Sequence, residues 1–409
     1  MCSTDGMSRR VTRSADKTPV KPSASSSSSS PITSSSSSSS SSSKPPSYTH
    51  PPAPSSPSKL TDHMSGLLFS GSYLNTFIEL LFLAVLFNIP PSLAPSASMP
   101  PRALFNFALG KSLFTRVYNA YLEAVFFAYP QHRTQPSDDH KLKKQQDLTG
   151  RDQVQQDTLV YHDRMTLITD NLLNITLYLL IPGFYPLSSS QPFLERAARL
   201  VLNHYLMSLG MYWSHRALHV VPYLWREIHS IHHYAKTPLS RVTYQDHWFD
   251  NFGNAVVGQT FAQILIPLDL PTFVVSRVFR VAESLEKHSG HSSGWNLAHA
   301  VQYKWMPFAQ MPHHHDWHHE GFKSCNYTFS SLGGVWDYAF NTRRTGRAAN
   351  PDEPAGKWAT RLDEDQNKRG KEKVEKSVMD SPYAVVLPDL AIGAAAAYKL
   401  WTCGGSICY

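Results

Sequence analysis

Histidines recur at regular spacings between residues 215 and 319, and the rest of the chain is organised around this stretch. It contains His215-Arg-Ala-Leu-His219, His229-Ser-Ile-His232-His233 and His313-His314-His315-Asp316-Trp317-His318-His319. Residues at positions i, i+3 and i+4 lie on one face of a helix. Each cluster can therefore direct two or three imidazoles at one spot, and we predict that the stretch is helical.

The number of these ligands favours two metal ions over one. A lone histidine on a helix is usually a surface or satisfied core residue, but three clusters in register indicate a metal site. A tetrahedral zinc takes four ligands, whereas imidazoles on two transition-metal ions leave positions open for chemistry. The spacing selects eight ligands: His215, His219, His229, His232, His233, His315, His318 and His319.

The order HxxxH, HxxHH, HxxHH resembles the fatty acid hydroxylase/sterol desaturase superfamily of membrane di-iron oxygenases. Its sterol C4-methyl oxidase branch is similar in further segments, namely Arg280-Val-Ala-Glu283-Ser-Leu-Glu-Lys-His288-Ser-Gly290, His314–His319 and Trp336-Asp337-Tyr338. The resemblance covers about residues 200–342. It implies His288 as a ninth metal ligand.

Three carboxylates near the histidines are candidate partners of the metal site. Asp316 and Glu320 lie within the third cluster, and carboxylates beside metal-bound imidazoles commonly accept the second ring N–H. Glu283 matches an acidic residue of the sterol-oxidase branch, where the resemblance implies that it ligates or orients. A solvated or salt-bridged glutamate is the alternative interpretation for Glu283.

Three other histidines stand near the motifs without matching them fully. His247 resembles a family position that proline usually follows, but here Trp248 follows, which favours a structural or near-site role over ligation. His314 is surplus to the motif and is predicted only as a neighbour of the site. His291 stands where the sterol branch usually has an aromatic residue, and this departure bears on the substrate.

The resemblance implies an O2-dependent oxygenase that hydroxylates an unactivated C–H bond of a lipid. A sterol 4-methyl group is the first candidate, and a sphingoid base or fatty acyl chain is the second. The implied cofactors are two iron ions and O2, with electrons derived from NAD(P)H, in the endoplasmic reticulum membrane. The sequence has no His-Pro-Gly-Gly, the mark of a fused cytochrome-b5-like module in some relatives. We therefore expect a separate membrane donor, a cytochrome b5-like protein or its reductase.

Long apolar runs predict an all-α integral membrane protein with about four transmembrane helices, a re-entrant hairpin and a cytosolic histidine-rich helical cap. The four runs cover residues 66–89, 103–129, 166–184 and 194–213. The second run carries charges, so it either spans the bilayer or lies at its interface. Residues 252–281, interrupted by Pro267 and Pro271, predict the hairpin. Residues 385–401 predict a final apolar helix, either a short one packed on the membrane domain or a further span.

Composition divides the chain into five predicted parts. They are a disordered Ser/Pro-rich tail (1–64), N-terminal membrane helices (65–198), the catalytic domain (199–342), a charged linker (343–382) and an apolar C-terminal segment (383–409). The net charge of +7 lies outside the apolar runs, which places the tail and the histidine clusters on the cytosolic side. No nucleic-acid motif is present. The four scattered cysteines predict unpaired thiols in a reducing compartment.

Other classes of protein remain as alternatives. A zinc metalloprotease needs HExxH, and Arg216 stands where that glutamate would be. A histidine-rich membrane metal transporter or metal store is the non-enzymatic alternative. Transport sites usually lie at mid-membrane, whereas these clusters flank the ends of apolar runs. An inactive homologue is disfavoured by the intact ligand set.

Overall fold

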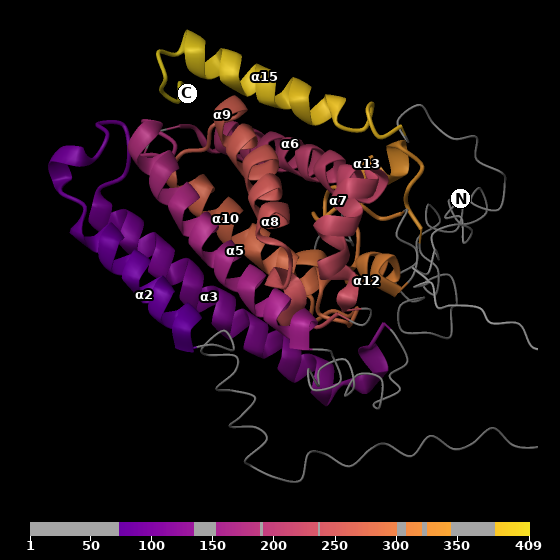
Figure 1. The fold of residues 1–409 in the computed structure, drawn as a ribbon. Coiled ribbons are helices and arrows are strands. Elements are labelled where there is room, and N and C mark those ends of the chain that lie inside the picture. Colours follow the sequence, from indigo (N-terminus) through magenta and orange to yellow (C-terminus); the bar gives the residue numbers. More distant parts are fainter. Residues whose placement is uncertain are drawn as a thin grey trace, which may run out of the picture. The chain divides into compact units, whose positions relative to one another are not determined.

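Helices and their connecting loops make up the described part of the chain (Figure 1). The computed structural model describes residues 73–134, 153–188, 191–235, 238–300, 308–320, 325–344 and 381–409. Within these residues there is no strand, and two isolated bridges join Ser98 to Pro186 and Arg133 to His291. The predicted all-α class is therefore confirmed. The predicted tail and most of the predicted linker lie outside the described residues.

The elements of the described residues follow one another along the chain. In order they are α2 (Tyr73–Asn88), η1 (Pro91–Leu93), α3 (Pro101–Ala128), η2 (Pro130–His132), α5 (Gln153–Leu180), α6 (Phe193–Val220), α7 (Pro222–Glu227), η4 (His229–Tyr234), η5 (Ser240–Tyr244), α8 (Trp248–Asn254), the π-helix η6 (Ala255–Thr260), α9 (Phe261–Leu265), α10 (Leu270–Lys287), α12 (Pro312–Glu320), α13 (Gly334–Ala339) and α15 (Leu387–Thr402).

Several helix starts follow directly from the sequence. Pro101 and Pro222 begin α3 and α7, where a missing backbone N–H costs nothing. Asp269 caps α10, because its carboxylate accepts a hydrogen bond from the backbone N–H of Thr272 at 3.3 Å. The predicted interruption near Pro267 is present, since α9 ends at Leu265 and α10 begins at Leu270.

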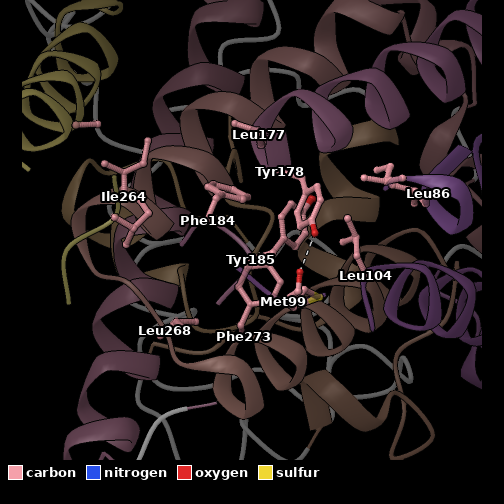
Figure 2. Close-up of a cluster of buried hydrophobic side chains, with 13 residues drawn as sticks. Leu86, Met99, Leu104, Leu177, Tyr178, Phe184, Tyr185, Ile264, Leu268 and Phe273 are labelled. Atoms are coloured by element: carbon pink, nitrogen blue, oxygen red, sulfur yellow. Dashed lines mark hydrogen bonds between the residues drawn. The ribbon is translucent and has the colours of Figure 1, made fainter. Parts of the chain in front are cut away.

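The long helices pack around a shared apolar cluster (Figure 2). α3 lies against α2 and α10, α5 against α2 and α8, and α15 against α6 and α9. In the cluster, the Tyr178 hydroxyl donates to the Met99 carbonyl oxygen at 2.8 Å, and Tyr185 and Phe273 meet edge to face with ring centroids 5.5 Å apart. This packing fixes α10, which leads towards the histidines.

Two glycines allow α6 and the π-helix η6 to approach very closely. A Cβ on Gly210 would lie 2.7 Å from the Val257 carbonyl oxygen, and a Cβ on Gly258 would lie 2.4 Å from Met211 Cγ. Single π-turns occur frequently at functional sites. Here the π-turn directly follows α8, so the contact sets the position of α8 relative to the histidines of α6.

The observed helices agree with the predicted apolar runs and extend two of them. α5 starts at Gln153, 13 residues before the predicted start at Thr166, and α6 continues beyond Trp213 through both His215 and His219. The predicted C-terminal helix is present as α15 and packs on α6 and α9. Among the described residues, no helix is both long enough and apolar enough to qualify as a membrane span.

The prediction that all cysteines are unpaired is wrong for two of them. Cys403 and Cys408 form a disulfide with a Cα–Cα distance of 6.0 Å. Gly404 and Gly405 between them adopt positive φ angles of 66° and 81°, so the chain turns back at the end of α15 and brings the sulfurs together. Cys325 is a buried free thiol.

Candidate metal centre

The nine histidines predicted as ligands gather in two neighbouring groups. In each group, one candidate ligand atom per residue lies within 4.8 Å of all the others. Group one contains His215, His219, His229, His233 and His318, and group two contains His232, His288, His315 and His319. The groups adjoin, since the His233 and His319 rings stack with centroids 4.6 Å apart.

Spacing within each sequence cluster determines which group a histidine joins. The i, i+4 pairs stay together: His215 with His219, His229 with His233, and His315 with His319. The member at i+3 joins the other group, as His232 and His318 do. Each cluster therefore directs two imidazoles at one spot, within the predicted two or three, and the second and third clusters each contribute their remaining member to the other group. On a helix, residues at i+3 and i+4 diverge by about 100° around the axis.

Four elements carry these side chains to one place. α6 supplies His215 and His219, and α12 supplies the third cluster. His288 is the C-cap residue of α10. The second cluster forms the 3-10 helix η4 instead of the α-helix that its spacing predicted. α7 ends at Glu227, and the tighter turn of η4 follows at once.

Hydrogen bonds at Nδ1 fix the tautomer of five rings. A carbonyl or carboxylate oxygen only accepts, so each of these Nδ1 atoms carries the proton and leaves an Nε2 lone pair. The bonds run from His215 to Tyr327 O (2.6 Å), His318 to Cys325 O (2.6 Å), His288 to Ser284 O (3.0 Å), His319 to Ala235 O (3.0 Å) and His229 to the Asp250 carboxylate. This arrangement is typical of metal-bound histidines.

The Nε2 atoms face one another at distances that suit a shared cation. His215 Nε2 lies 3.0 Å from His229 Nε2, although both rings are protonated at Nδ1, so two lone pairs oppose each other. In group two, His315 Nε2 lies 3.0 Å from His288 Nε2 and 3.2 Å from His319 Nε2. With metal–nitrogen bonds of about 2.1 Å, these separations correspond to angles of about 90–100° at the metal. The donor set therefore fits metal ions.

The burial of the rings keeps them in the form that binds metal. Burial, reinforced by neighbouring imidazoles, lowers the pKa of His232 to about 4. The same causes hold the pKa well below the usual range in His215, His233, His288, His315, His318 and His319. Among the described residues, His318 Nε2 and both ring nitrogens of His233 have no hydrogen-bond partner. Such buried neutral nitrogens suit a metal ion.

A buried polar frame holds the loop that supplies two of the accepting carbonyls. The Asp337 carboxylate accepts hydrogen bonds from the backbone N–H of Tyr327 at 2.9 Å and of Thr328 at 3.0 Å. It also accepts from the Gln310 side chain at 2.7 Å. Lys287 is fully buried and donates to Gln310 Oε1 at 3.0 Å, and burial lowers its pKa to about 7. The frame fixes the Tyr327 carbonyl that orients His215.

Glu283 belongs to a separate buried network and to neither histidine group. Its carboxylate accepts from the Ser331 backbone N–H at 2.8 Å, and His204 Nε2 lies 3.3 Å away. Burial alone would raise the pKa of Glu283, but His204 and Arg280 hold it well below the usual range. Arg280 also donates to the Phe329 carbonyl oxygen at 3.0 Å, and the Phe329 ring stacks on His215. Glu283 therefore supports the loop beside the site.

The other predicted partners lie around the groups without joining them. Asp316 is buried on α12, and the side chain of Glu320 lies outside the described residues. His247 caps α8 by accepting from the Phe249 backbone N–H at 3.1 Å, in agreement with the predicted structural role. His314 Nδ1 lies 3.1 Å from the Met311 backbone nitrogen at the start of α12. His291 is buried in the bridge to Arg133.

Sequence reasoning missed Asp250 as the carboxylate partner of a predicted ligand. One Asp250 oxygen accepts the Nδ1 proton of His229, and the other accepts from Asn254 at 2.7 Å. The sequence marks Asp250 only as an acid three residues after His247, and its distance from His229 along the chain hides the contact. The Asp250/Asn254 pair at i, i+4 on α8 is the one local signal of a fixed carboxylate.

One cavity adjoins the histidines, and a larger cavity adjoins the first. The smaller, about 60 Å³, is lined by His229, His232 and His288 among others. The larger, about 120 Å³, lies between α3, α5, α8, η6 and α10. Six lining residues are common to both: Met211, Tyr244, Asn251, Asn254, Arg280 and Ser284. The cavities therefore lead from the helix interior to both histidine groups.

A comparison with known protein families identifies the segment that contains the nine histidines. The fatty acid hydroxylase family matches residues 200–342, which include all nine histidines. This chain carries a fatty acid hydroxylase domain. The recognition made from the histidine motifs is thereby confirmed.

Relatives of the hydroxylase domain include proteins of more than one named activity. The methylsterol monooxygenase erg25B of Aspergillus fumigatus is 30% identical over 187 residues, which are 44% of this chain and 60% of that protein. Methylsterol monooxygenase 1-3 of Arabidopsis thaliana is 28% identical over 151 residues (36% and 49%). The very-long-chain aldehyde decarbonylase GL1-10 of Oryza sativa subsp. japonica is 29% identical over 150 residues (36% and 47%).

These matches are partial in length. The chain spans 47–60% of the length of these three relatives. No solved structure matches the chain. The comparisons thus support the domain and its superfamily.

Proposed function

We propose that the two histidine groups each bind an iron ion and that the protein is an O2-dependent oxygenase acting on a C–H bond of a lipid. The observation that carries this proposal is the convergence of nine mostly buried imidazoles, five with their tautomer fixed, into two adjoining groups. A pair of bound iron ions would supply the reduction of O2 that C–H oxidation requires. In the net reaction, the C–H bond, O2, two electrons and two protons give an alcohol and water.

The residues of the chain have separate tasks in this proposal. The nine histidines hold the ions, while Asp250 and the Tyr327 carbonyl keep His229 and His215 in the tautomer that binds metal. The smaller cavity receives the reactive carbon between His229, His232 and His288. Enclosure in this cavity excludes bulk water from the reacting atoms. The larger cavity holds the remainder of the substrate.

A lipid substrate fits the surface of the helices. Large apolar side chains are exposed on several of them, including Phe77 on α2, Val117 on α3, Leu180 on α5 and Trp401 on α15, each more than 60% exposed. Contiguous exposed apolar surface of this kind marks contact with a membrane or a partner. We propose that α2, α3, α5 and α6 insert in the endoplasmic reticulum membrane with the histidine groups at its cytosolic side.

The substrate candidates differ in what supports them. Two of the three relatives named above are methylsterol monooxygenases, which supports a sterol 4-methyl group as the substrate. A sphingoid base or a fatty acyl chain is the second candidate. Electrons would come from a separate membrane donor, a cytochrome b5-like protein or its reductase.

Metal analysis combined with oxygen uptake tests the proposal. The purified protein should contain about two irons per chain, one for each group, and consume O2 only when both a lipid substrate and a reductant are present. One or more zinc ions per chain, together with metal flux through proteoliposomes, would support the metal transporter instead. Lipid profiling of cells lacking the protein would then show which precursor accumulates.

A further inference from the structure

α15 runs along the helix bundle from the neighbourhood of the histidine groups to the opposite end. Just before the helix, Val385 is fully buried and packs with Tyr212 and Trp213 of α6. At the other end of α15, the Lys399 Nζ donates to the Leu265 carbonyl oxygen at 3.0 Å, where α9 ends. In Figure 1, α15 passes from the side of α13 to the side of α9. α15 therefore begins beside the metal centre and ends far from it.

The distance between these two levels is close to the thickness of a bilayer. Arg199 of α6 donates to the Pro267 carbonyl oxygen at 3.3 Å, so it lies at the level where α9 ends. From residue 199 to His215 there are 16 positions of the same helix, about 24 Å at about 1.5 Å per residue. α15 also has 16 residues. The hydrocarbon core of an endoplasmic reticulum membrane is about 27 Å thick.

The side of α15 that faces away from the other helices is apolar. Leu390, Tyr398 and Trp401 are each more than half exposed. The two charged residues of the helix turn towards protein, since Asp389 has a buried carboxylate oxygen and Lys399 makes the hydrogen bond given above. An uncharged apolar face of this length fits lipid chains. Tyrosine and tryptophan near one end are typical of the membrane–water interface.

The disulfide lies just beyond the end of α15 that is far from the histidines. Cys403 and Cys408 close a short hairpin, and the backbone N–H of Ile407 within it donates to the Pro182 carbonyl oxygen at 2.8 Å. Pro182 follows the end of α5, so the hairpin joins the ends of two helices. Disulfides persist in oxidising compartments such as the lumen of the endoplasmic reticulum and are rare in the cytosol. This end of the bundle therefore suits the lumenal side.

We propose that α15 crosses the membrane beside α6 with its apolar face against lipid, and that it carries the Cys403–Cys408 hairpin to the lumenal side, opposite the histidine groups. This proposal rests on the membrane placement proposed above, to which it adds a fifth crossing and a side for the disulfide. Formation of the bond removes one hydrogen from each thiol and reduces one disulfide of a lumenal thiol oxidant. The hairpin then fastens the end of α15 to the end of α5.

Glycosylation of an added acceptor tests the side on which α15 ends. An Asn-X-Thr acceptor on a flexible linker is appended after Tyr409 of the 409-residue chain, and in a second protein it is placed ahead of Met1. Both proteins are expressed in cells and detected by their mobility before and after endoglycosidase treatment. The acceptor after Tyr409 should be glycosylated, and the acceptor ahead of Met1 should not. Glycosylation of both, or of neither in a protein that stays in carbonate-washed membranes, would overturn the proposal.

Two substitutions at one position distinguish a membrane crossing from packing on the surface. Ala395 is an exposed residue near the middle of α15. Ala395→Arg should lower the ratio of glycosylated to unglycosylated acceptor after Tyr409 by about tenfold or more, because arginine at the centre of a membrane helix opposes insertion. Ala395→Leu is the matched control and should leave the ratio unchanged. An unchanged ratio in Ala395→Arg would mean that this face meets water, which contradicts the crossing.

Counting thiols tests the state of the hairpin in cells. Free thiols are blocked in intact cells, and a polyethylene glycol maleimide then adds a fixed mass for each thiol that reduction releases. The wild-type chain should gain two such additions, and the double variant Cys403→Ser/Cys408→Ser should gain none. No addition to the wild-type chain would place the hairpin in a reducing compartment and refute its lumenal position.

The membrane placement, the oxygenase function and the crossing of α15 can fail separately. Release of the protein by carbonate would refute the membrane placement and the crossing together. A glycosylated acceptor after Tyr409 in a protein that binds no iron would refute the oxygenase function and keep the assignment of α15.

Discussion

The two histidine groups are built from the same residue type but are held in different ways. Group one has five members, a carboxylate partner at His229 and a half-buried member, His219, which stacks on Trp225. Group two has four buried members, and its resolved Nδ1 partners are backbone carbonyls only. If both groups bind the proposed iron ions, the smaller number of ligands in group two would leave more positions for O2 and substrate. We therefore expect the more reactive ion in group two and the more tightly held ion in group one.

Removing one ligand from each group should show the largest difference between the two groups. His232→Ala leaves three ligands in group two, while His318→Ala leaves four in group one, enough for a four-coordinate ion. Both variants should lose turnover, but only His232→Ala should lose about one metal per chain. Metal content and O2 uptake measure this. The control is His162→Gln, a histidine outside both groups, and full activity in either alanine variant would refute the ligand assignment.

Asp250→Asn should weaken group one alone. The variant removes the carboxylate that accepts the His229 Nδ1 proton, and loss of such a partner typically lowers metal affinity about 10- to 100-fold. Titration with a chelator should show one ion released earlier and the other unchanged. Asn254→Ala, which removes only the hydrogen bond to the second Asp250 oxygen, should have a smaller effect. Loss of both ions together would mean that the groups do not bind independently.

Acid should destabilise the metal-free protein through the buried imidazoles. Burial holds their pKa values below the usual value of about 6.5, and it lowers that of His232 to about 4. Between these values the unfolded chain binds protons that the folded protein does not, so the free energy of unfolding falls as the pH falls. Each such histidine contributes at most about 1.4 kcal/mol per pH unit.

Denaturant unfolding from pH 7 to pH 4 measures this slope. His232→Gln should make the free energy of unfolding depend less steeply on pH. Bound metal should suppress this dependence at neutral pH. A pH-independent stability in the metal-free protein would show that the rings are not held neutral.

The smallest expected effect concerns the glycines between α6 and η6. Gly210→Ala places a methyl against the Val257 carbonyl and should destabilise the fold by about 1–3 kcal/mol. Gly110→Ala on α3 is the matched control, because no atom lies within 4 Å of the added Cβ. It should stabilise by up to about 1 kcal/mol. Thermal unfolding compares the two, and equal shifts would show that the close approach of α6 and η6 does not matter.

The sequence predicted the identity of the clustered histidines better than their arrangement. Spacing identified eight of them and the resemblance added His288, because a face of a helix is encoded locally. The division of His229, His232 and His233 between two groups was not predicted, although side chains at i+3 and i+4 already diverge by about 100° around a helix. His315, His318 and His319 divide in the same way on α12. Likewise, the carbonyls of Tyr327 and Cys325 and the carboxylate of Asp250 come from distant segments that only the tertiary packing brings near.

The fold, too, could be predicted from the sequence only in part. The apolar runs located α3, α6 and α15 closely, because long hydrophobic stretches bounded by proline are strong local signals. They missed the first 13 residues of α5, which are mostly polar in sequence; within them, Asp163 accepts a hydrogen bond from Asn75 of α2. The disulfide between Cys403 and Cys408 was missed because it depends on the positive φ angles of two glycines, which composition does not reveal.

The contact at Gly210 and Gly258 restricts the substitutions that the protein can accept between α6 and η6. α6, which carries His215, and η6, which follows Asp250 and α8, are so close that no extra carbon fits between them. The contact therefore fixes the position of His215 relative to the Asp250 carboxylate, which orients His229 of the same group. A single added methyl group at either glycine would have to displace one side of this histidine group from the other.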